Sequence, residues 1–151
     1  MMSPLLFQYC PKIAVFHGDR VLVCRRKGEA DYDGVFSLIG GKMEHSDASI
    51  VEGLQREKNE EVGEDFRVRL LPRFSIDTHF VKNDGHHMIL PHFYAEFSGG
   101  DIHLSDEYSE YAWLSFDDLR AATNIIDNLR WIVPALHGVG VVQSPELLVE
   151  M

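Results

Sequence analysis

The chain has 151 residues, of which 45% are hydrophobic and 25% charged, which is the composition of an ordinary globular domain. This length can bury a substantial core, so we predict a single domain spanning residues 1–151. The formal net charge of −10 argues against non-specific binding to nucleic-acid polymers or anionic membranes, because both need a basic surface. It does not exclude a nucleotide substrate, because a bound metal ion can invert the local field.

No stretch approaches about 18 consecutive apolar residues, so no membrane-spanning helix is predicted. The start, "MMSPLLFQYC", lacks the basic region of a signal peptide, and we expect a cytoplasmic protein. The two cysteines, Cys10 and Cys24, lie on separate apolar runs without metal-ligand spacing. Reduced thiols fit a cytoplasmic protein, and a disulfide between them is the alternative.

The first half of the chain predicts strands followed by one helix. Residues 10–16 and 20–27 are rich in strand-forming side chains and flank "HGD", so they predict a hairpin. Residues 35–39, "VFSLI", predict another short strand, and a loop follows. Ser49 and Glu52 form the S-x-x-E capping pattern, and Gly63 is typical of a helix end. A helix is therefore expected over residues 49–62.

The second half predicts a second hairpin and two further helices. Residues 66–81 and 86–97 are strand-like on either side of the "KNDG" turn, with an interruption at Pro72. Residues 110–116 predict a last strand, and residues 116–122 and 123–136 predict helices. Residues 137–151 have little pattern, and we expect them to be loosely held. Mixed strands with a central and a C-terminal helix indicate an α/β fold in which helices cover a mixed sheet.

The central predicted helix carries clustered carboxylates. Within "QREKNEEVGE", Glu57, Glu60 and Glu61 stand at i, i+3 and i+4, which places them in one sector about 100° wide. Like charges at this spacing repel by a few tenths of a kcal/mol per pair. The apolar face of this helix is thin, because Lys58 takes a position where an apolar residue would help. The residues therefore allow two interpretations: a solvated acidic face, or a site for Mg²⁺ or Mn²⁺, which prefer oxygen ligands.

The flanking residues favour the metal site. The segment "GGKMEHSDASIVEGLQREKNEEVG" resembles the Nudix box, G-x5-E-x7-R-E-U-x-E-E-x-G-U, in which U is apolar. The R-E-x-x-E-E-x-G part of the box is complete, in Arg56, Glu57, Glu60, Glu61 and Gly63.

The segment also departs from the box. One residue too many lies between Gly41 and Arg56, so the first box glutamate is replaced either by Asp47, with a one-residue insertion, or by nothing. Both apolar box positions are charged, as Lys58 and Glu64. In the family the early glutamate pairs with the box arginine, so these departures concern the orientation of Arg56 rather than the carboxylates.

The resemblance implies a Nudix α/β/α sandwich with a mixed central sheet, and metal-dependent hydrolysis of a nucleoside diphosphate derivative. It implies Mg²⁺, with Mn²⁺ as a substitute, as the cofactor. The metal ligands that it implies are Glu57, Glu60, Glu61 and the carbonyl of Gly41. The catalytic residues that it implies are Glu57 as general base, Arg56, Glu60 and Glu107.

Glu107 is included, and Glu110 is a further candidate, because some Nudix enzymes take their base from a loop after the sheet hairpin. A strand with one wet face is the alternative explanation for Glu110, and it applies to Glu107 as well.

The last third of the chain suggests the substrate. "EYSEYAWLSFDDL" and "ATNIIDNLRWIV" resemble the C-terminal part of bacterial Nudix nucleoside triphosphatases, which implies conversion of a nucleoside or deoxynucleoside triphosphate to the monophosphate and pyrophosphate. Lys42 is expected at a phosphate, Asn124 and Asn128 are candidates for contact with the base, and Tyr32 is expected to stack on it. Helix capping is the alternative for Asn124, solvent exposure is the alternative for Asn128, and core packing is the alternative for Tyr32.

Three functions thus remain open. The first is the nucleoside triphosphate pyrophosphatase, and the second keeps the chemistry but acts on ADP-ribose, a dinucleoside polyphosphate or a nucleotide sugar. The third is a Nudix-fold module that binds a nucleotide without cleaving it. In each case the partner is a small nucleotide, with no nucleic-acid polymer and no membrane, and the family resemblance suggests a homodimer.

Overall fold

The structure is a computed structural model that describes residues 3–28 and 32–151. Its elements in chain order are β1 (Phe7–Tyr9), β2 (Lys12–His17), β3 (Arg20–Arg26), β4 (Phe36–Ser37), β5 (Ile39–Gly40), α1 (Ile50–Val62), β6 (Arg67–Val81), β7 (His87–Gly99), β8 (Tyr108–Leu114), α2 (Phe116–Ala121), α3 (Leu129–Gly140), the 3₁₀ turn η1 (Pro145–Leu147) and β9 (Val149–Glu150). Across the described residues, no helix is long and apolar enough to cross a membrane.

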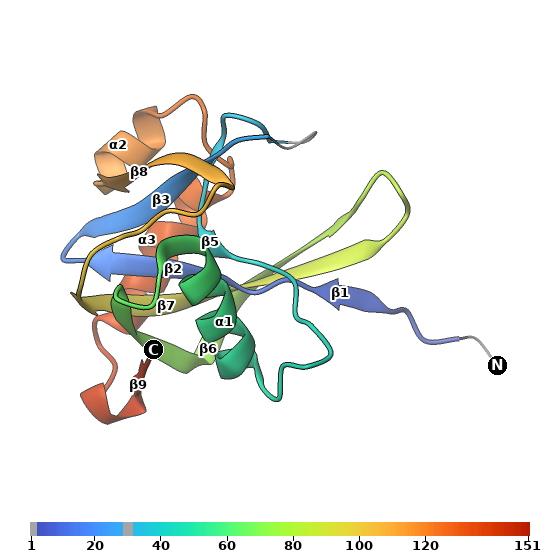
Figure 1. Cartoon of the computed structure of the whole chain (residues 1–151), viewed down its shortest axis with the longest axis horizontal. Helices are drawn as coiled ribbons and strands as arrows, with labels where there is room; N and C mark the ends of the chain where they lie inside the picture. The colour runs from blue at the N-terminus through green and yellow to red at the C-terminus, as the bar shows by residue number, and fades with distance from the viewer. Residues whose placement is uncertain (1–2, 29–31) are drawn as a thin grey trace.

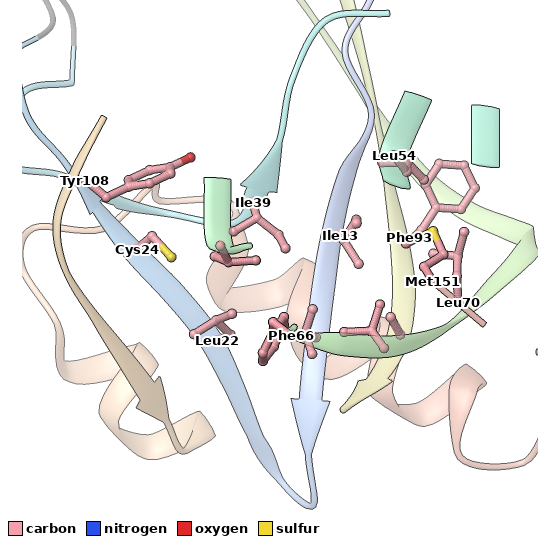
Figure 2. Packing of buried hydrophobic residues seen from close by; sticks show 14 residues of the cluster. Ile13, Leu22, Cys24, Ile39, Leu54, Phe66, Leu70, Phe93, Tyr108 and Met151 are labelled. Carbon is pink, nitrogen blue, oxygen red and sulfur yellow. The ribbon is translucent and has the colours of Figure 1, made fainter. Parts of the chain in front are cut away.

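The sheet is covered on both faces, which confirms the predicted α/β/α sandwich (Figure 1). The run "IAVF" of β2 is apolar throughout, as expected for a strand that is buried on both faces. Alternation sends Ile13 and Val15 into the cluster that α1 closes, part of which Figure 2 shows. Ala14 and Phe16 point the other way, into the cluster that α2 and α3 close.

The sheet is mixed, and its main path runs in the order β4-β3-β2-β7-β6-β9. The predicted hairpin of β2 and β3 is antiparallel, whereas β2 and β7 are parallel. The second predicted hairpin, β6 and β7, is long, and its far end projects from the body of the molecule (Figure 1). β1, which the sequence pattern did not predict, pairs in parallel with β7 along this projection.

The helix α1 begins and ends where its capping residues predict. The Ser49 side chain accepts a hydrogen bond from the backbone N–H of Glu52, and the N–H of Gly63 donates to the carbonyl of Asn59. Gly63 has a φ of 96°, which favours glycine. The predicted thin apolar face is completed by Lys58, which is only 1% exposed. Its ammonium group donates to the carbonyls of Gly63 at 3.2 Å and Phe66 at 2.6 Å.

Two predicted boundaries are wrong. The C-terminal helix α3 begins at Leu129 rather than near residue 123. The chain before it pairs with Phe36 instead: the Phe36 N–H donates to the carbonyl of Asn124, and the Ile126 N–H donates to the carbonyl of Phe36. The predicted strand "VFSLI" is divided into β4 and β5 around Leu38, because β4 pairs with β3 and β5 pairs with β2.

The expectation of a loosely held C-terminal segment is also wrong. β9 pairs with β6, and Met151 exchanges two backbone hydrogen bonds with Val68. The Met151 side chain is 7% exposed and lies in the α1-side cluster, beside Leu70 and Phe93 (Figure 2). A strand of two residues is too short to give a period-2 pattern, so the sequence carried no signal for it.

Candidate functional site

Two of the three clustered carboxylates face a common cavity of about 830 Å³, called here the acidic cavity. α1 brings Glu57 and Glu61 to its wall, and Gly41, Lys42 and Glu107 line it as well. These five residues come from the loop after β5, from α1 and from the turn before β8, and the structure brings them together at one cavity.

Glu60, the third carboxylate, does not line the acidic cavity. Its side chain is 58% exposed, whereas that of Glu57 is 14% exposed. It lies 3.3 Å from the Arg56 guanidinium, one turn back along α1. The i, i+4 spacing thus places Glu61 deepest and leaves Glu60 at the rim. Glu110 lies on β8, 3.8 Å from Arg25 and more than half exposed, in agreement with a strand that has one wet face.

Glu61 is the most constrained of these acids. It is 2% exposed, and its Oε1 accepts a hydrogen bond from the Gly40 N–H at 3.1 Å. Its Oε2 accepts a hydrogen bond from the hydroxyl of Tyr108. Burial raises the pKa of Glu61 to about 8, against the opposing effect of the Lys12 ammonium. A cation in the cavity would offset this cost of burying a carboxylate.

The glycine pair before Lys42 allows the close approach of loop and helix. A Cβ atom on Gly41 would lie 2.6 Å from the Glu57 carboxylate, so a larger residue would displace that side chain. Gly40 has a φ of 129°, and a Cβ there would meet the backbone of Pro11 at 2.3 Å. Gly41 therefore sets the distance between the loop and the Glu57 carboxylate, and Gly40 allows the chain to lie close to the backbone of Pro11.

Asp47 supplies the partner of Arg56 despite the extra residue in the loop. The Arg56 Nε and Nη2 donate to the two Asp47 oxygens at 3.0 and 2.9 Å, which is a bidentate pair. The Arg56 Nη1 also donates to Glu57 at 3.0 Å. The hydrogen bonds from Arg56 lower the pKa of the Asp47 carboxyl, and those to Asp47 raise the pKa of Arg56. Asp47 thus makes the arginine contact that the Nudix resemblance assigns to the first box glutamate.

A second, largely apolar cavity of about 410 Å³ lies on the α3 side of the sheet. We call it the apolar cavity, and its lining includes Tyr32, Leu38, Phe80, Met88 and Asn128. Tyr32 is the residue that the sequence analysis expects to stack on a base, and its φ of 62° is unusual for a residue other than glycine.

Asn128, rather than Asn124, lines the apolar cavity. The backbone carbonyl of Asn124 is bound to Phe36, and this residue belongs to the lining of neither cavity. The Oδ1 atom of Asn128 is buried and has no hydrogen-bond partner among the described residues. Because this atom has almost no accessible surface, an N–H group of a bound molecule would reach it only after the amide turns toward the cavity.

The two cavities share three lining residues, Cys10, Lys12 and Arg26, which the sequence analysis did not assign. Lys12 donates to the Gly40 carbonyl at 3.1 Å, and Arg26 donates to the Ser37 hydroxyl at 3.4 Å. Both cysteines are free. A charged Lys12 directly before the buried run "IAVF" was the one available signal, since such a position favours a side chain directed into a polar site.

Among the described residues, the side chains that could bind a cation do not form a complete set of metal ligands. Within residues 3–28 and 32–151, no three histidine, cysteine or acidic side chains converge as a metal site. Arg56 forms ion pairs with both Glu57 and Glu60, so its positive charge offsets part of their negative charge. Mg²⁺ in enzymes is nevertheless commonly held by one or two carboxylates, waters and substrate phosphates, and Glu57 and Glu61 fit this pattern.

The family model described as the NUDIX domain matches residues 11–135. No curated protein matches the chain in sequence.

Several solved structures share the fold. A MutT protein from Methanosarcina mazei Go1 superposes with a TM-score of 0.72 at 20% identity, covering 92% of this chain and 99% of its own. A MutT NUDIX hydrolase from Burkholderia pseudomallei gives 0.67 at 23% identity, with 89% and 98% covered. An Ap4A hydrolase from C. elegans gives 0.71 at 11% identity, again with 89% and 98% covered.

Proposed function

Since the chain belongs to the Nudix family and is a Nudix pyrophosphohydrolase, we propose that it hydrolyses a nucleoside or deoxynucleoside triphosphate to the monophosphate and pyrophosphate, with Mg²⁺ as cofactor. The observation that carries this proposal is that the two cavities share three lining residues, Cys10, Lys12 and Arg26, and are therefore neighbours. One ligand with an aromatic end and an anionic end would occupy both.

The apolar cavity suits the nucleobase. Tyr32 and Phe80 provide aromatic faces for stacking, and Leu38 and Met88 provide apolar contact area. With its amide turned toward the cavity, Asn128 would accept a hydrogen bond at Oδ1 from an N–H on the edge of a base. We therefore assign base recognition to Tyr32 and Asn128, and not to Asn124.

The acidic cavity suits the phosphates and the metal. Lys12 and Lys42 supply positive charge along its wall, and Glu57 and Glu61 supply hard oxygen ligands for Mg²⁺, together with the Gly41 carbonyl. The bound ion would neutralise the polyphosphate and polarise the attacked phosphorus. Glu60 would bind the metal ion only if its ion pair with Arg56 were broken. We therefore keep it as a more distant candidate metal ligand.

The protein groups then position the reaction. Glu57 accepts a proton from the attacking water, whose oxygen bonds to phosphorus as the bond from phosphorus to the bridging oxygen breaks. Glu107, which also lines the acidic cavity, is the alternative base. Arg56, held by Asp47, keeps the Glu57 carboxylate in place rather than contacting the substrate itself.

The lining of the acidic cavity favours a triphosphate over substrates with two large organic groups. A dinucleoside polyphosphate, a nucleotide sugar or ADP-ribose would place a second organic group beyond the phosphates. Among the described residues there, the hydrophobic side chains are Cys10, Met43 and Tyr108, and the aromatic ring of Tyr108 is buried in the core. The fold itself does not distinguish between these classes of substrate, since the Ap4A hydrolase from C. elegans shares it.

The proposal is tested by incubating the protein with Mg²⁺ and a panel of NTPs, dNTPs, ADP-ribose, nucleotide sugars and dinucleoside polyphosphates. We expect one or more triphosphates to be turned over fastest. Glu57→Gln should lower turnover by orders of magnitude, and Glu52→Gln, on an exposed position of the same helix, should not. Binding of nucleotides without turnover of any compound would instead support the non-catalytic module.

A further inference from the structure

Tyr108, the first residue of β8, has no role in the chemistry described above, yet its hydroxyl reaches a central carboxylate. The residue is 4% exposed, and its ring belongs to the α1-side cluster, where Figure 2 shows it beside Cys24. The same side chain lines the acidic cavity, and its hydroxyl donates to Oε2 of Glu61. A ring fixed by the core therefore directs one hydroxyl to one acid.

Glu61 is thereby held at both oxygens by donors from different elements. The Gly40 N–H, at the end of β5, binds Oε1, and the Tyr108 hydroxyl binds Oε2. Each carboxylate oxygen keeps a second lone pair, so this fixed group can still coordinate a cation. Fixing the ligand in advance spares the entropy of ordering it when the ion binds.

The main chain at the end of α1, at Glu61 and Val62, is also hydrogen-bonded to the segment that leads to Glu107. The Ser105 N–H donates to the Glu61 carbonyl at 3.0 Å, and the His103 N–H donates to the Val62 carbonyl at 2.9 Å. Tyr108 follows Glu107 directly in the chain. The backbone contact and the hydroxyl contact therefore join the end of α1 to the segment that presents Glu107 to the acidic cavity.

We propose that Tyr108 is a positioning residue that orients the Glu61 carboxylate for divalent cation and holds the Glu107 turn in register with α1. The assignment of a cation to this cavity rests on the proposed function. Partners that orient a metal ligand typically change metal affinity by 10- to 100-fold when they are removed.

The first test is Mn²⁺ binding to the nucleotide-free protein, measured by electron paramagnetic resonance of the free ion. Tyr108→Phe keeps the ring and removes only the hydroxyl, and it should weaken Mn²⁺ binding by about 10-fold or more. Tyr94→Phe is the matched control, because Tyr94 is equally buried but lies in the α3-side cluster, stacked on Phe16. Its Mn²⁺ affinity should equal that of the unchanged protein.

A double-mutant cycle separates this role from a general loss of structure. In a Glu61→Gln background, Tyr108→Phe should cause little further loss of Mn²⁺ affinity. An equal loss in both backgrounds, or unchanged affinity in Tyr108→Phe, would overturn the proposal, as would absence of Mn²⁺ binding to the unchanged protein.

A second measurement does not depend on the folding of Tyr108→Phe. Mg²⁺ added to the unchanged protein should perturb the near-ultraviolet absorption of tyrosine, and Glu61→Gln should abolish this difference spectrum. A spectrum that persists in Glu61→Gln contradicts the proposal. If these results hold while no nucleotide is turned over, the proposed function fails and the role of Tyr108 stands.

Discussion

Lys58 shows how a charged residue can occupy a buried position that usually holds an apolar side chain. Its alkyl chain fills the core position next to Leu54, while its ammonium group binds the carbonyls of Gly63 and Phe66 just beyond the helix. Burial lowers the pKa of Lys58, and the two carbonyls offset part of the cost of desolvation. The side chain therefore replaces an apolar residue and also ties the end of α1 to the start of β6.

The two asparagines before α3 allow a direct test of base recognition. Asn128 lines the apolar cavity with a buried, unpaired Oδ1, whereas Asn124 is engaged with Phe36 through its backbone. We expect Asn128→Ala to raise KM for the preferred triphosphate about 10-fold while kcat changes little, because it removes one hydrogen bond to a bound group. Steady-state kinetics of both variants decide the matter, and a larger effect of Asn124→Ala would reinstate the assignment made from sequence.

His92 predicts a pH dependence of stability. It is 2% exposed, and its Nδ1 lies 2.9 Å from the Ile76 carbonyl, so this nitrogen carries the proton and donates it. Burial lowers the pKa of His92 below its ordinary 6.5, with Lys12 acting in the same direction and Asp77 opposing it. Below about pH 6.5 the unfolded chain takes up a proton that the folded one resists, so this contribution to stability is present above that pH and is lost as the pH falls.

Urea unfolding between pH 7.5 and 5 measures this effect. The slope that His92 adds cannot exceed about 1.4 kcal/mol per pH unit. His92→Asn keeps a donor near the Ile76 carbonyl but does not titrate, so its unfolding free energy should fall less steeply with acid. Parallel curves for the two proteins would show that His92 is not the group responsible.

Among the helices and strands, those whose ends are determined by neighbouring residues were predictable from the sequence. The capping residues Ser49 and Gly63 predicted both ends of α1, and the apolar runs on either side of "HGD" predicted the hairpin of β2 and β3. The start of α3 was not predictable, because residues 124–126 are held by the distant strand residue Phe36 rather than by their own helical propensity. The partner of Arg56 was left open in the sequence and became evident only when the folded loop brought Asp47 to it.

The C-terminal strand β9 makes a testable contribution to stability. Met151→Ala should lower the free energy of unfolding by about 2–5 kcal/mol, as for other buried large-to-small changes. Val142, which is largely exposed, provides the control, and Val142→Ala should change stability by no more than about 0.5 kcal/mol. Chemical denaturation compares the two, and equal stabilities would mean that the end of the chain does not support the core.

For the whole molecule, the sheet separates two tasks. Its α1 side carries the acids, and its α3 side carries the apolar cavity, while Lys12 and its neighbours on the central strands join the two. A net charge of −10 would not prevent binding of a polyphosphate in this arrangement, because basic side chains and the proposed divalent ion would dominate the local field. The sequence revealed the acids through their spacing, but the joining residues come from separate strands, and only the fold brings them together.

Product analysis by ³¹P nuclear magnetic resonance tests the central claim most directly. With Mg²⁺ and the preferred triphosphate, the account predicts equal amounts of nucleoside monophosphate and pyrophosphate. A chelator or Glu57→Gln should abolish their formation. Release of orthophosphate with a nucleoside diphosphate, or turnover that persists without divalent cation, would contradict it.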